Sequence, residues 1–536
     1  MTLHSRFTAP TMPLVVQIGF AGSRSLFASQ DHPDLDADAF DAAVLDHLTE
    51  RLSQLPRELG LSDQHFLCGI SQVAIGADTV FTRACKALSI PQQLFLPQHR
   101  ENYLAEVGSQ GRPDFSPDQQ RAARDLMDSA HIIHQRVVSD AASRHDRFKD
   151  ANLEIVHCSD VLICLVRDAA ESKQGGTRDL IERARKRGKP VLEITVSLKD
   201  RLPHFEQTWH GRDALIQPTL PHALHGLVFP PRVAPGDLPE VADYAGHLKN
   251  FTSAHSRTHS RLFKSSAFII IGTHVIATVC AVIVLQVHEP SILPALLTGE
   301  LLLLLAGFGV HEYLHRSEAS HVWAVSRLLS ELARSLQAVG RLPVYLNYLF
   351  SLPFPADLQP LLRTLSVLHL RSSAGGKGQP WEPLRDSYVQ KRFTGLNAQL
   401  EFYERESNAA QRYRKLAQQT FVLFSVGAMI AALVKLLVSF GYLSMLPRDL
   451  TGIVGGSLAI VLPVLAVASL GLAAAFDLEA RAHLFWDMLA FLEIQKDCLT
   501  SASSEREFAK LLLETESRLL GETLTWFTRR WFTGVA

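Results

Sequence analysis

Four long apolar runs dominate the second half of the chain. They cover roughly residues 265–287, 291–310, 420–446 and 451–475. Each run reaches the ~20 residues that a helix needs to cross the ~30 Å of hydrocarbon in a bilayer. The runs pair off across two short connections, so the pattern predicts an all-α membrane domain with four transmembrane helices in two hairpins. Buried core helices of a large soluble protein are the alternative, which the regular pairing disfavours.

The basic residues near these runs are distributed unevenly. The loop inside the first pair, His288–Pro290, has no Lys or Arg, and the loop inside the second pair has one, Arg448. By the positive-inside rule, this asymmetry predicts a multi-pass protein of the inner (plasma) membrane with cytoplasmic N- and C-termini. The basic residues on the other side are Arg257, Arg261, Lys264, Arg316, Arg412, Arg414, Lys415 and Arg481.

Two ionisable residues, Glu300 and Lys435, interrupt the apolar runs. An isolated charge in the membrane costs several kcal/mol, so each is expected to face a partner or water. One interpretation is a pore or a coupled pair. The other is that Lys435 extends its ammonium group to the interface while Glu300 is protonated or lies near it. The glycines of residues 452–457 permit close helix approach, which suits a homo-oligomer.

The first 200 residues follow a different pattern, in which short apolar runs alternate with amphipathic segments such as 40–55 and 178–188. This alternation predicts a doubly wound, Rossmann-like α/β domain with a parallel sheet. Ligands of such sheets bind beyond the carboxyl ends of the strands, where the strand order reverses. The expected strands are residues 14–20, 65–71, 92–97, 159–166 and 190–196.

Glycine-bearing turns follow three of these strands. Glycine lets backbone N–H groups approach a phosphate, and a helix N-terminus favours an anion. Arginine adds a forked cation, serine adds a hydroxyl donor, and Asp78 is a candidate helix N-cap or acceptor for a ribose hydroxyl. The turns therefore predict a phosphate-bearing, nucleotide-derived ligand. The candidate ligand-binding residues are Gly22, Ser23, Arg24, Gly76, Asp78, Gly175, Gly176, Thr177 and Asp179.

The order of these motifs resembles a known superfamily. The chain carries GFAGSRS, then AIGAD, then RFKDANLEIVHCSDVLICLV and GGTRDLIERARKRGKPV. Over about residues 14–200 this series resembles the SLOG superfamily, which includes LOG-type nucleoside-monophosphate phosphoribohydrolases and sensor domains for nucleotide-derived messengers. The resemblance implies a cytoplasmic Rossmann-like domain that binds a nucleotide-derived ligand.

One position separates the chain from the hydrolases. Those enzymes carry PGGxGTxxE, whereas this chain has Lys173-Gln174-Gly175-Gly176-Thr177 and then Leu180 where the catalytic glutamate would stand. Asp179 and Glu182 flank that position, but a helix turns by about 100° per residue, so neither carboxylate replaces it without a shift. General acid–base catalysis needs the carboxylate within hydrogen-bond reach of the bond. The sequence therefore favours binding without turnover, and a membrane-tethered LOG-like hydrolase is the alternative.

The second half of the chain also resembles a known family. Two-helix hairpins, each followed by a cytoplasmic helix with a His/Glu pattern, resemble the SLATT effector family, which is associated with SLOG domains in prokaryotic conflict systems. His321 and Glu331 follow the first hairpin as His483 and Glu493 follow the second. The two resemblances together imply a membrane sensor-effector that perturbs or permeabilises the membrane in prokaryotic antiviral defence, with membrane lipids and further copies of the chain as partners.

A rival motif, HExxH, occurs at His311-Glu312-Tyr313-Leu314-His315. On a helix this spacing places two imidazoles on one face as zinc ligands, with Glu312 as a general base. A zinc metallopeptidase is therefore a further alternative. A juxtamembrane helix whose histidines meet headgroups explains the motif equally well and is favoured.

Net charge and cysteine content narrow the remaining functional classes. The net charge is -1 and the pI is about 7.1, so no overall basic field indicates a nucleic-acid partner. The six cysteines form no CxxC pair and predict neither a disulfide framework nor a metal site. The expected organisation is a SLOG-like domain (1–203), a Pro-rich linker (204–246), a first hairpin with its cytoplasmic helix (247–340), a connecting segment (341–410) and a second hairpin with C-terminal helices (411–536).

Overall fold

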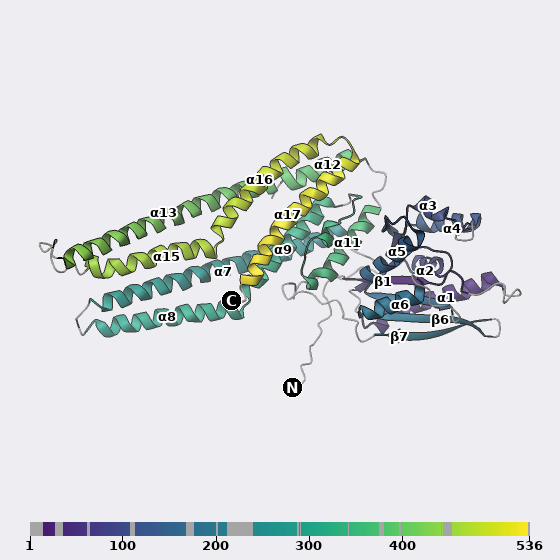
Figure 1. The fold of residues 1–536 in the computed structure, drawn as a ribbon, viewed down its shortest axis with the longest axis horizontal. Helices are drawn as coiled ribbons and strands as arrows, with labels where there is room; N and C mark the ends of the chain where they lie inside the picture. Colours follow the sequence, from purple (N-terminus) through teal and green to yellow (C-terminus); the bar gives the residue numbers. More distant parts are fainter. Residues whose placement is uncertain are drawn as a thin grey trace, which may run out of the picture. The chain divides into compact units, whose positions relative to one another are not determined.

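The chain forms two compact units in the computed structural model (Figure 1). The first consists of Met1–His247 and Val339–Gln379, and the second of Leu248–Ala338 and Pro380–Ala536. The structure describes residues 14–26, 36–61, 65–107, 113–167, 176–199, 202–211, 224, 240–286, 289, 291–340, 342–374, 380–395, 398–440, 442 and 453–533.

A seven-stranded, mostly parallel sheet organises the first unit, with the strand order β4-β3-β2-β1-β5-β6-β7. Only β7 runs antiparallel, against β6, among the pairs of this sheet. This confirms the predicted α/β class with a parallel sheet. The strands are β1 (Leu14–Gly22), β2 (His65–Ser71), β3 (Gln92–Leu96), β4 (Ile132–Val137), β5 (Val161–Arg167), β6 (Val191–Lys199) and β7 (Leu202–His210).

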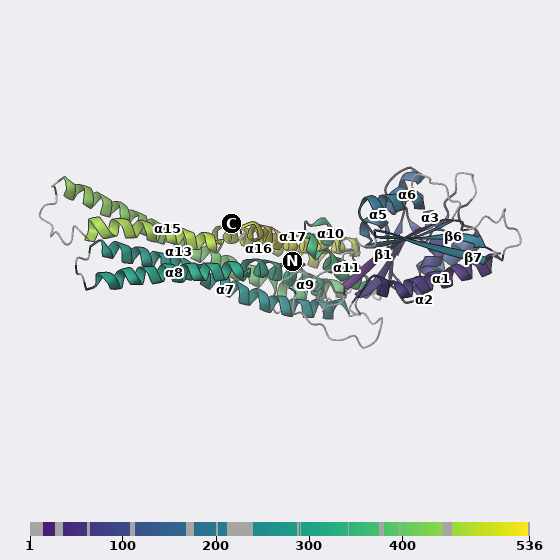
Figure 2. The same ribbon diagram turned by 90° about the horizontal axis from the view of Figure 1, so that it is seen from below.

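Helices cover both faces of the sheet, because its central strands are buried on both sides and need apolar partners. α1 (Ala37–Glu58) and α2 (Ala77–Ala87) pack on one face, and α5 (Arg144–Cys158) and α6 (Thr177–Lys186) on the other (Figure 2). Phe20 and Phe81 stack at 4.3 Å between their ring centroids and join β1 to α2. α3 (Arg100–Leu104) and α4 (Pro117–Met127) close a smaller core beside β3 and β4.

The two edge strands were absent from the sequence prediction. β4 and β7 are only partly buried, so neither shows the apolar run that identifies a central strand. β7 also changes the expected boundary, since Leu202–His210 pairs with β6 where the linker was expected to begin at residue 204. Apart from Leu224, the stretch from 212 to 239 lies outside the described residues.

A later segment of the chain completes the first unit. α11 (Gln359–Ala374) packs on the sheet together with α10 (Tyr348–Ser351) and the short helix η3 (Ala356–Leu358). The Val15 N–H donates to the Thr364 hydroxyl at 2.9 Å, and the Arg363 guanidinium pairs with Asp160. Part of the expected connecting segment, 341–410, is therefore structural support for the sheet.

Helices alone form the described part of the second unit, and four of its helical stretches are long and apolar enough to cross a membrane. They contain α7, α8, α13 and α15, whose hairpin pairing agrees with the prediction (Figure 1). The helices are α7 (Val241–Val284), α8 (Leu293–Arg316), α9 (Ala319–Val339), α12 (Trp381–Val389), η4 (Gln390–Thr394), α13 (Gln399–Ser439), η5 (Ile453–Leu458), α15 (Ala459–Ala475), α16 (Leu478–Ser501) and α17 (Glu505–Thr533).

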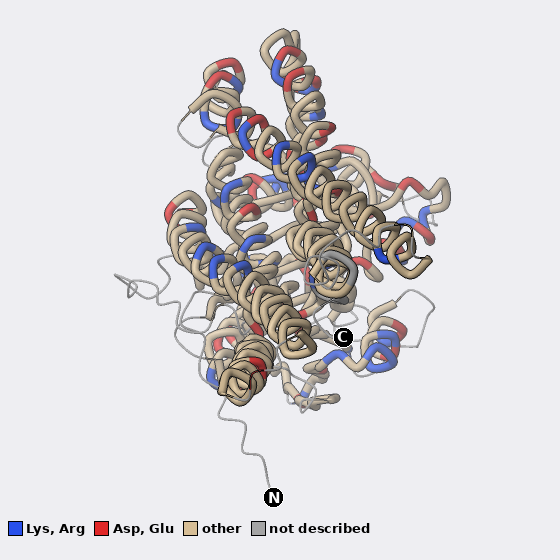
Figure 3. The backbone as a smooth tube through the Cα atoms, turned by 90° about the vertical axis from the view of Figure 1, so that its left-hand side faces the viewer, with Lys and Arg blue, Asp and Glu red and all other residues tan. Residues whose placement is uncertain are grey.

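Two of these helices are much longer than a membrane is thick. α7 has 44 residues and α13 has 41, or roughly 60 Å each at 1.5 Å per residue. One half of each helix is apolar, apart from Lys435 in α13, and the other half carries the remaining Lys, Arg, Asp and Glu residues (Figure 3). Large apolar side chains such as Phe308, Leu423 and Val467 point outward on the apolar halves. This arrangement suits helices surrounded by lipid, with polar extensions outside it.

The two hairpins repeat a common plan. α8 is followed by α9 after a break at Glu318, and α15 is followed by α16 after a break at Asp477. Both acidic residues have left-handed backbone angles, with φ of 47° and 52°. Such conformations are uncommon for residues other than glycine, so their recurrence after both hairpins supports the common plan.

Candidate functional site

The strand order places a topological switch point at the carboxyl ends of β1 and β5. Strands β2, β3 and β4 continue to one side of β1, whereas β5, β6 and β7 continue to the other. In doubly wound sheets, the loops that leave the strands at such a point are the usual ligand site. The three predicted turns follow β1, β2 and β5, which are the strands around this point.

Ser23 connects the turn after β1 to the end of β5 and to the start of α2 through hydrogen bonds. Its N–H donates to the Leu165 carbonyl at 2.9 Å, and its carbonyl accepts from the Ala77 N–H at 3.2 Å. Its hydroxyl oxygen accepts from the Arg167 N–H at 3.2 Å, which leaves the hydroxyl proton to be donated elsewhere. The structure thus brings the turns after β1 and β2 together at the end of β5.

Gly22 and Gly76 allow this close approach. A Cβ at Gly22 would lie 2.1 Å from the Ala77 Cβ, and one at Gly76 would lie 2.3 Å from the Arg24 carbonyl oxygen. Gly76 also has φ of +85°, a backbone conformation that residues with a side chain rarely adopt. Gly76 is the N-cap of α2, so Asp78 stands inside the first turn and the predicted N-cap role of Asp78 is wrong.

Arg24 extends from the first turn into a network of charges. Its guanidinium pairs with Asp114 at 3.0 Å and lies 5.2 Å from the centre of the Phe148 ring. Arg144 pairs with the same Asp114 carboxylate. The Arg24 side chain is 45% exposed, so an anion from solvent can reach it. Phosphate binding by Arg24 requires that the anion shares or replaces the Asp114 contact.

Asp78 is a buried carboxyl group beside this network. Burial raises its pKa to about 7, although the Gln72 N–H and the charge of Arg24 both oppose that rise. Burial and the nearby Asp78 raise the pKa of Tyr103 as well. Within the described part of the chain, no hydrogen-bond partner reaches the buried Tyr103 hydroxyl. A carboxyl group that titrates near neutrality can donate or accept a hydrogen bond at a ligand.

The third turn lies farther along the same edge. Gly176 is the N-cap of α6, and Thr177 begins the helix. Asp179 pairs with Arg183 at 2.9 Å, one turn later on the same helix. Gly175 lies outside the described residues. The Asp179–Arg183 ion pair is local to α6 and does not reach Ser23, Arg24 or Asp78.

Residues of α5 connect the third turn to the second, and sequence reasoning missed them. Asn152 and Lys149 lie against Gly176 and Asp179. The Gln72 side-chain amide donates to the side-chain Oδ1 of Asn152 at 2.6 Å, and the Gln72 backbone N–H donates to Asp78. The sequence signal that could have identified them is the segment RFKDAN, which brings two cations and one amide side chain into the first half of α5.

Leu180 is a buried residue of the hydrophobic core. Its side chain is 2% exposed and packs with apolar residues of β5 and α5, such as Val166 and Ile155. Leu180, which only the sequence resemblance aligns with the catalytic glutamate of LOG-type hydrolases, therefore belongs to the hydrophobic core. A carboxylate at this place would be buried without a charge partner from that core, at a cost of several kcal/mol.

The other predicted polar sites are not joined into clusters. Glu300 is half-buried and Lys435 exposed, and no ion pair between described residues includes either side chain. Glu312 of the HExxH motif pairs with Arg316 at 2.7 Å. No group of three His, Cys, Asp or Glu side chains within the described ranges is arranged to hold a metal ion. The geometry therefore gives the zinc alternative no support.

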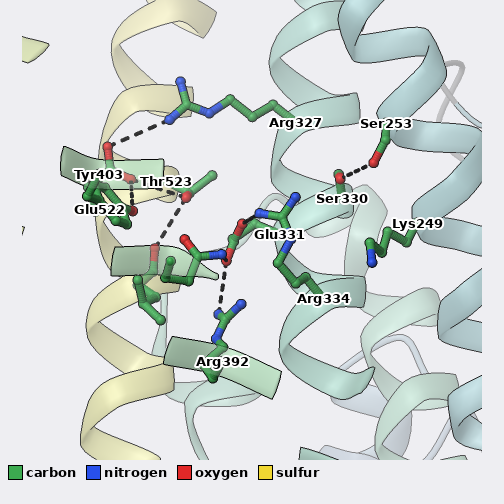
Figure 4. Close-up of polar contacts among 12 residues, drawn as sticks. Lys249, Ser253, Arg327, Ser330, Glu331, Arg334, Arg392, Tyr403, Glu522 and Thr523 are labelled. Carbon is green, nitrogen blue, oxygen red and sulfur yellow. Dashed lines mark hydrogen bonds and ion pairs between the residues drawn. The ribbon is translucent and has the colours of Figure 1, made fainter. Parts of the chain in front are cut away.

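A buried charge network in the second unit was also missed from the sequence (Figure 4). Arg392 is 1% exposed and donates to Glu516 and Glu331, each at 2.9 Å. Burial alone would raise the pKa of Glu331, but Arg334 and Arg392 outweigh it and lower that pKa. The partners come from separate helical segments, so no local spacing in the sequence reveals them.

The comparisons with known proteins found no counterpart for the chain. No family profile, no curated protein and no solved structure matches it. The geometry of its own residues therefore carries the functional argument.

Proposed function

We propose that the chain is a membrane-embedded sensor-effector. Its SLOG-like first unit binds a nucleotide-derived ligand at the carboxyl edge of the sheet, and its SLATT-like helices perturb or permeabilise the membrane in response, as part of prokaryotic antiviral defence. The observation that carries this proposal is the convergence of two glycine turns, Arg24 and buried Asp78 at the switch point of β1 and β5. The four apolar helices, each long enough to cross a membrane, are the part of the chain proposed to perturb it.

Two features support binding without cleavage. Leu180 is buried in the core where a hydrolase would carry its glutamate. The nearby carboxylate, Asp179, is engaged by Arg183. A sensor must also retain its ligand, because a ligand shifts an equilibrium only through its different affinities for the two states.

The test uses the full chain in potassium-loaded liposomes, with AMP, ADP-ribose and a cyclic dinucleotide as probes. At least one probe is expected to increase potassium leak. A hydrogen bond to a charged group contributes about 1.5–3 kcal/mol, so Arg24→Ala should shift the half-maximal probe concentration upward by about tenfold or more.

Arg121→Ala is the matched control, because Arg121 is an exposed arginine on α4 whose ion pair is with Asp118 alone among the described residues. The control should respond like the wild type. Absence of leak with all three probes, or an Arg24→Ala response equal to that of Arg121→Ala, would refute the proposal.

A further inference from the structure

A cavity of about 870 Å³ lies among the polar halves of the long helices in the second unit. Residues of α7, α9, α13, α16 and α17 line it. Eight of the lining residues are Lys or Arg, whereas three are Asp or Glu. The cavity therefore carries an excess of positive charge, although the chain as a whole has a net charge of -1. Concave cationic surfaces of this kind concentrate anions.

Several of these cations are held in fixed positions. Arg481 pairs with Glu406 at 2.6 Å. Arg530 pairs with Asp477 at 2.5 Å and donates to the Ala475 carbonyl at 2.9 Å. The Arg530 guanidinium also lies 5.2 Å from the centre of the Trp323 ring. Guanidinium groups positioned in advance lose less conformational entropy when an anion binds.

Two lysines of α7 complete the cationic wall without a carboxylate partner. Among the described residues, no Asp or Glu oxygen lies within ion-pair distance of the Lys249 or Lys264 ammonium group. Burial and the neighbouring Arg334 lower the pKa of Lys249, and Glu331 offsets only part of that decrease. Figure 4 shows Lys249 and Ser253 on α7 near Ser330 and Arg334 on α9. An entering anion would relieve this imbalance.

An apolar groove of about 530 Å³ adjoins the cationic cavity. Phe268, Leu416 and Leu472 contribute to it from α7, α13 and α15. Three residues line both spaces, namely Lys264, Phe476 and Arg481. Lys264 directly precedes the apolar run of α7, so the junction of the two spaces lies where the helix changes from polar to apolar.

We propose that the two spaces together bind one anionic phospholipid, with its phosphate near Lys264, Arg481 and Arg530 and an acyl chain along the groove. Basic pockets between membrane helices at the cytoplasmic headgroup level are suited to such lipids. This inference rests on the membrane placement in the proposed function, but it does not depend on a nucleotide ligand.

Charge and shape distinguish this occupant from two others. A soluble phosphate compound would fill the cationic cavity and gain nothing from the apolar groove. A zwitterionic lipid would fill the groove, but its own ammonium group would face the excess of lysine and arginine. Only a molecule with both a phosphoryl anion and a hydrocarbon chain uses all of the lining.

The test measures lipid binding to the full chain in detergent by native mass spectrometry, with phosphatidylglycerol and phosphatidylcholine of equal chain length. We expect phosphatidylglycerol to bind at least tenfold more tightly than phosphatidylcholine. Lys264→Gln removes a charge that has no carboxylate partner among the described residues, and Ala417→Phe fills the groove. Each should weaken phosphatidylglycerol binding about tenfold. Lys435→Gln is the matched control, because Lys435 also lies on an apolar helix but lines neither space.

Any one of three other results would overturn the proposed lipid site. Equal affinity for the two lipids would show that the cations do not select the occupant. Displacement of bound phosphatidylglycerol by inorganic pyrophosphate, together with an unaffected Ala417→Phe variant, would assign the cavity to a soluble phosphoryl ligand. An effect of Lys435→Gln as large as that of Lys264→Gln would show only general attraction. Failure of the membrane placement itself is distinguishable, since the chain would then stay monodisperse without detergent.

Discussion

Arg392→Met is expected to destabilise the second unit by about 3–5 kcal/mol. Arg392 is buried between Glu516, which is 0% exposed, and Glu331. The Tyr388 hydroxyl also donates to Glu516, at 2.7 Å. Methionine matches much of the arginine volume but removes the positive charge, so the Glu516 carboxylate loses its ion-pair partner in a low-dielectric environment. The cost of an unpaired buried charge exceeds the cost of the lost hydrogen bonds.

Thermal unfolding of the full chain in detergent measures this effect. Arg405→Met is the matched control, since Arg405 is exposed on α13 and should contribute within about 0.5 kcal/mol. The double variant Arg392→Met/Glu516→Gln should recover part of the loss, because it removes the orphaned charge. The electrostatic explanation fails if Arg392→Met is no more harmful than Arg405→Met, or if the second substitution adds to the loss.

Asp78→Asn is expected to change how the stability of the first unit depends on pH. Burial raises the Asp78 pKa from 3.8 to about 7, which corresponds to about 4 kcal/mol of differential stability between the two protonation states. Because the folded pKa lies above the unfolded pKa, the contribution is complete below about pH 4. It is lost as the pH rises towards 7 and stays constant above that value.

Pulse proteolysis of the full chain in detergent, followed through fragments of the first unit, reports this dependence. The stability of the Asp78→Asn variant relative to the wild type should be most favourable at pH 8, and this advantage should shrink towards pH 5. Asp118→Asn, at an exposed position on α4, should follow the wild type at every pH. Parallel profiles for wild type and Asp78→Asn would show that Asp78 does not titrate near neutrality.

The sequence predicts the central strands better than the edges. β1, β2, β3 and β5 each contain a run of buried apolar residues because helices cover both faces of the sheet, and β6 places buried apolar residues at alternate positions. β4 and β7 mix apolar and polar residues at the sheet edges, so neither stands out as an apolar run. β4 pairs with β3 across a long stretch of sequence, whereas β7 forms a hairpin with β6, the strand directly before it. The packing of α11 on the sheet was not predicted either, because Thr364, which accepts a hydrogen bond from Val15, lies 349 positions away in the sequence.

Only those residues of the candidate site that the backbone geometry requires could be predicted from the sequence. Gly22 and Gly76 are required by close backbone approach, which a glycine at a strand end signals directly. Asp114 and Tyr103 reach Arg24 and Asp78 through tertiary packing, for which the sequence gives no spacing rule. The same holds for the cationic cavity, whose lining comes from five helices.

The first unit is proposed to bind a nucleotide-derived ligand and to leave it intact. Equilibrium dialysis of the full chain against AMP and ADP-ribose, with chromatographic analysis of both compartments, measures both properties together. We expect at least one of the two nucleotides to accumulate with the protein and no free base to appear. Equal concentrations on both sides, or the release of adenine, would contradict it.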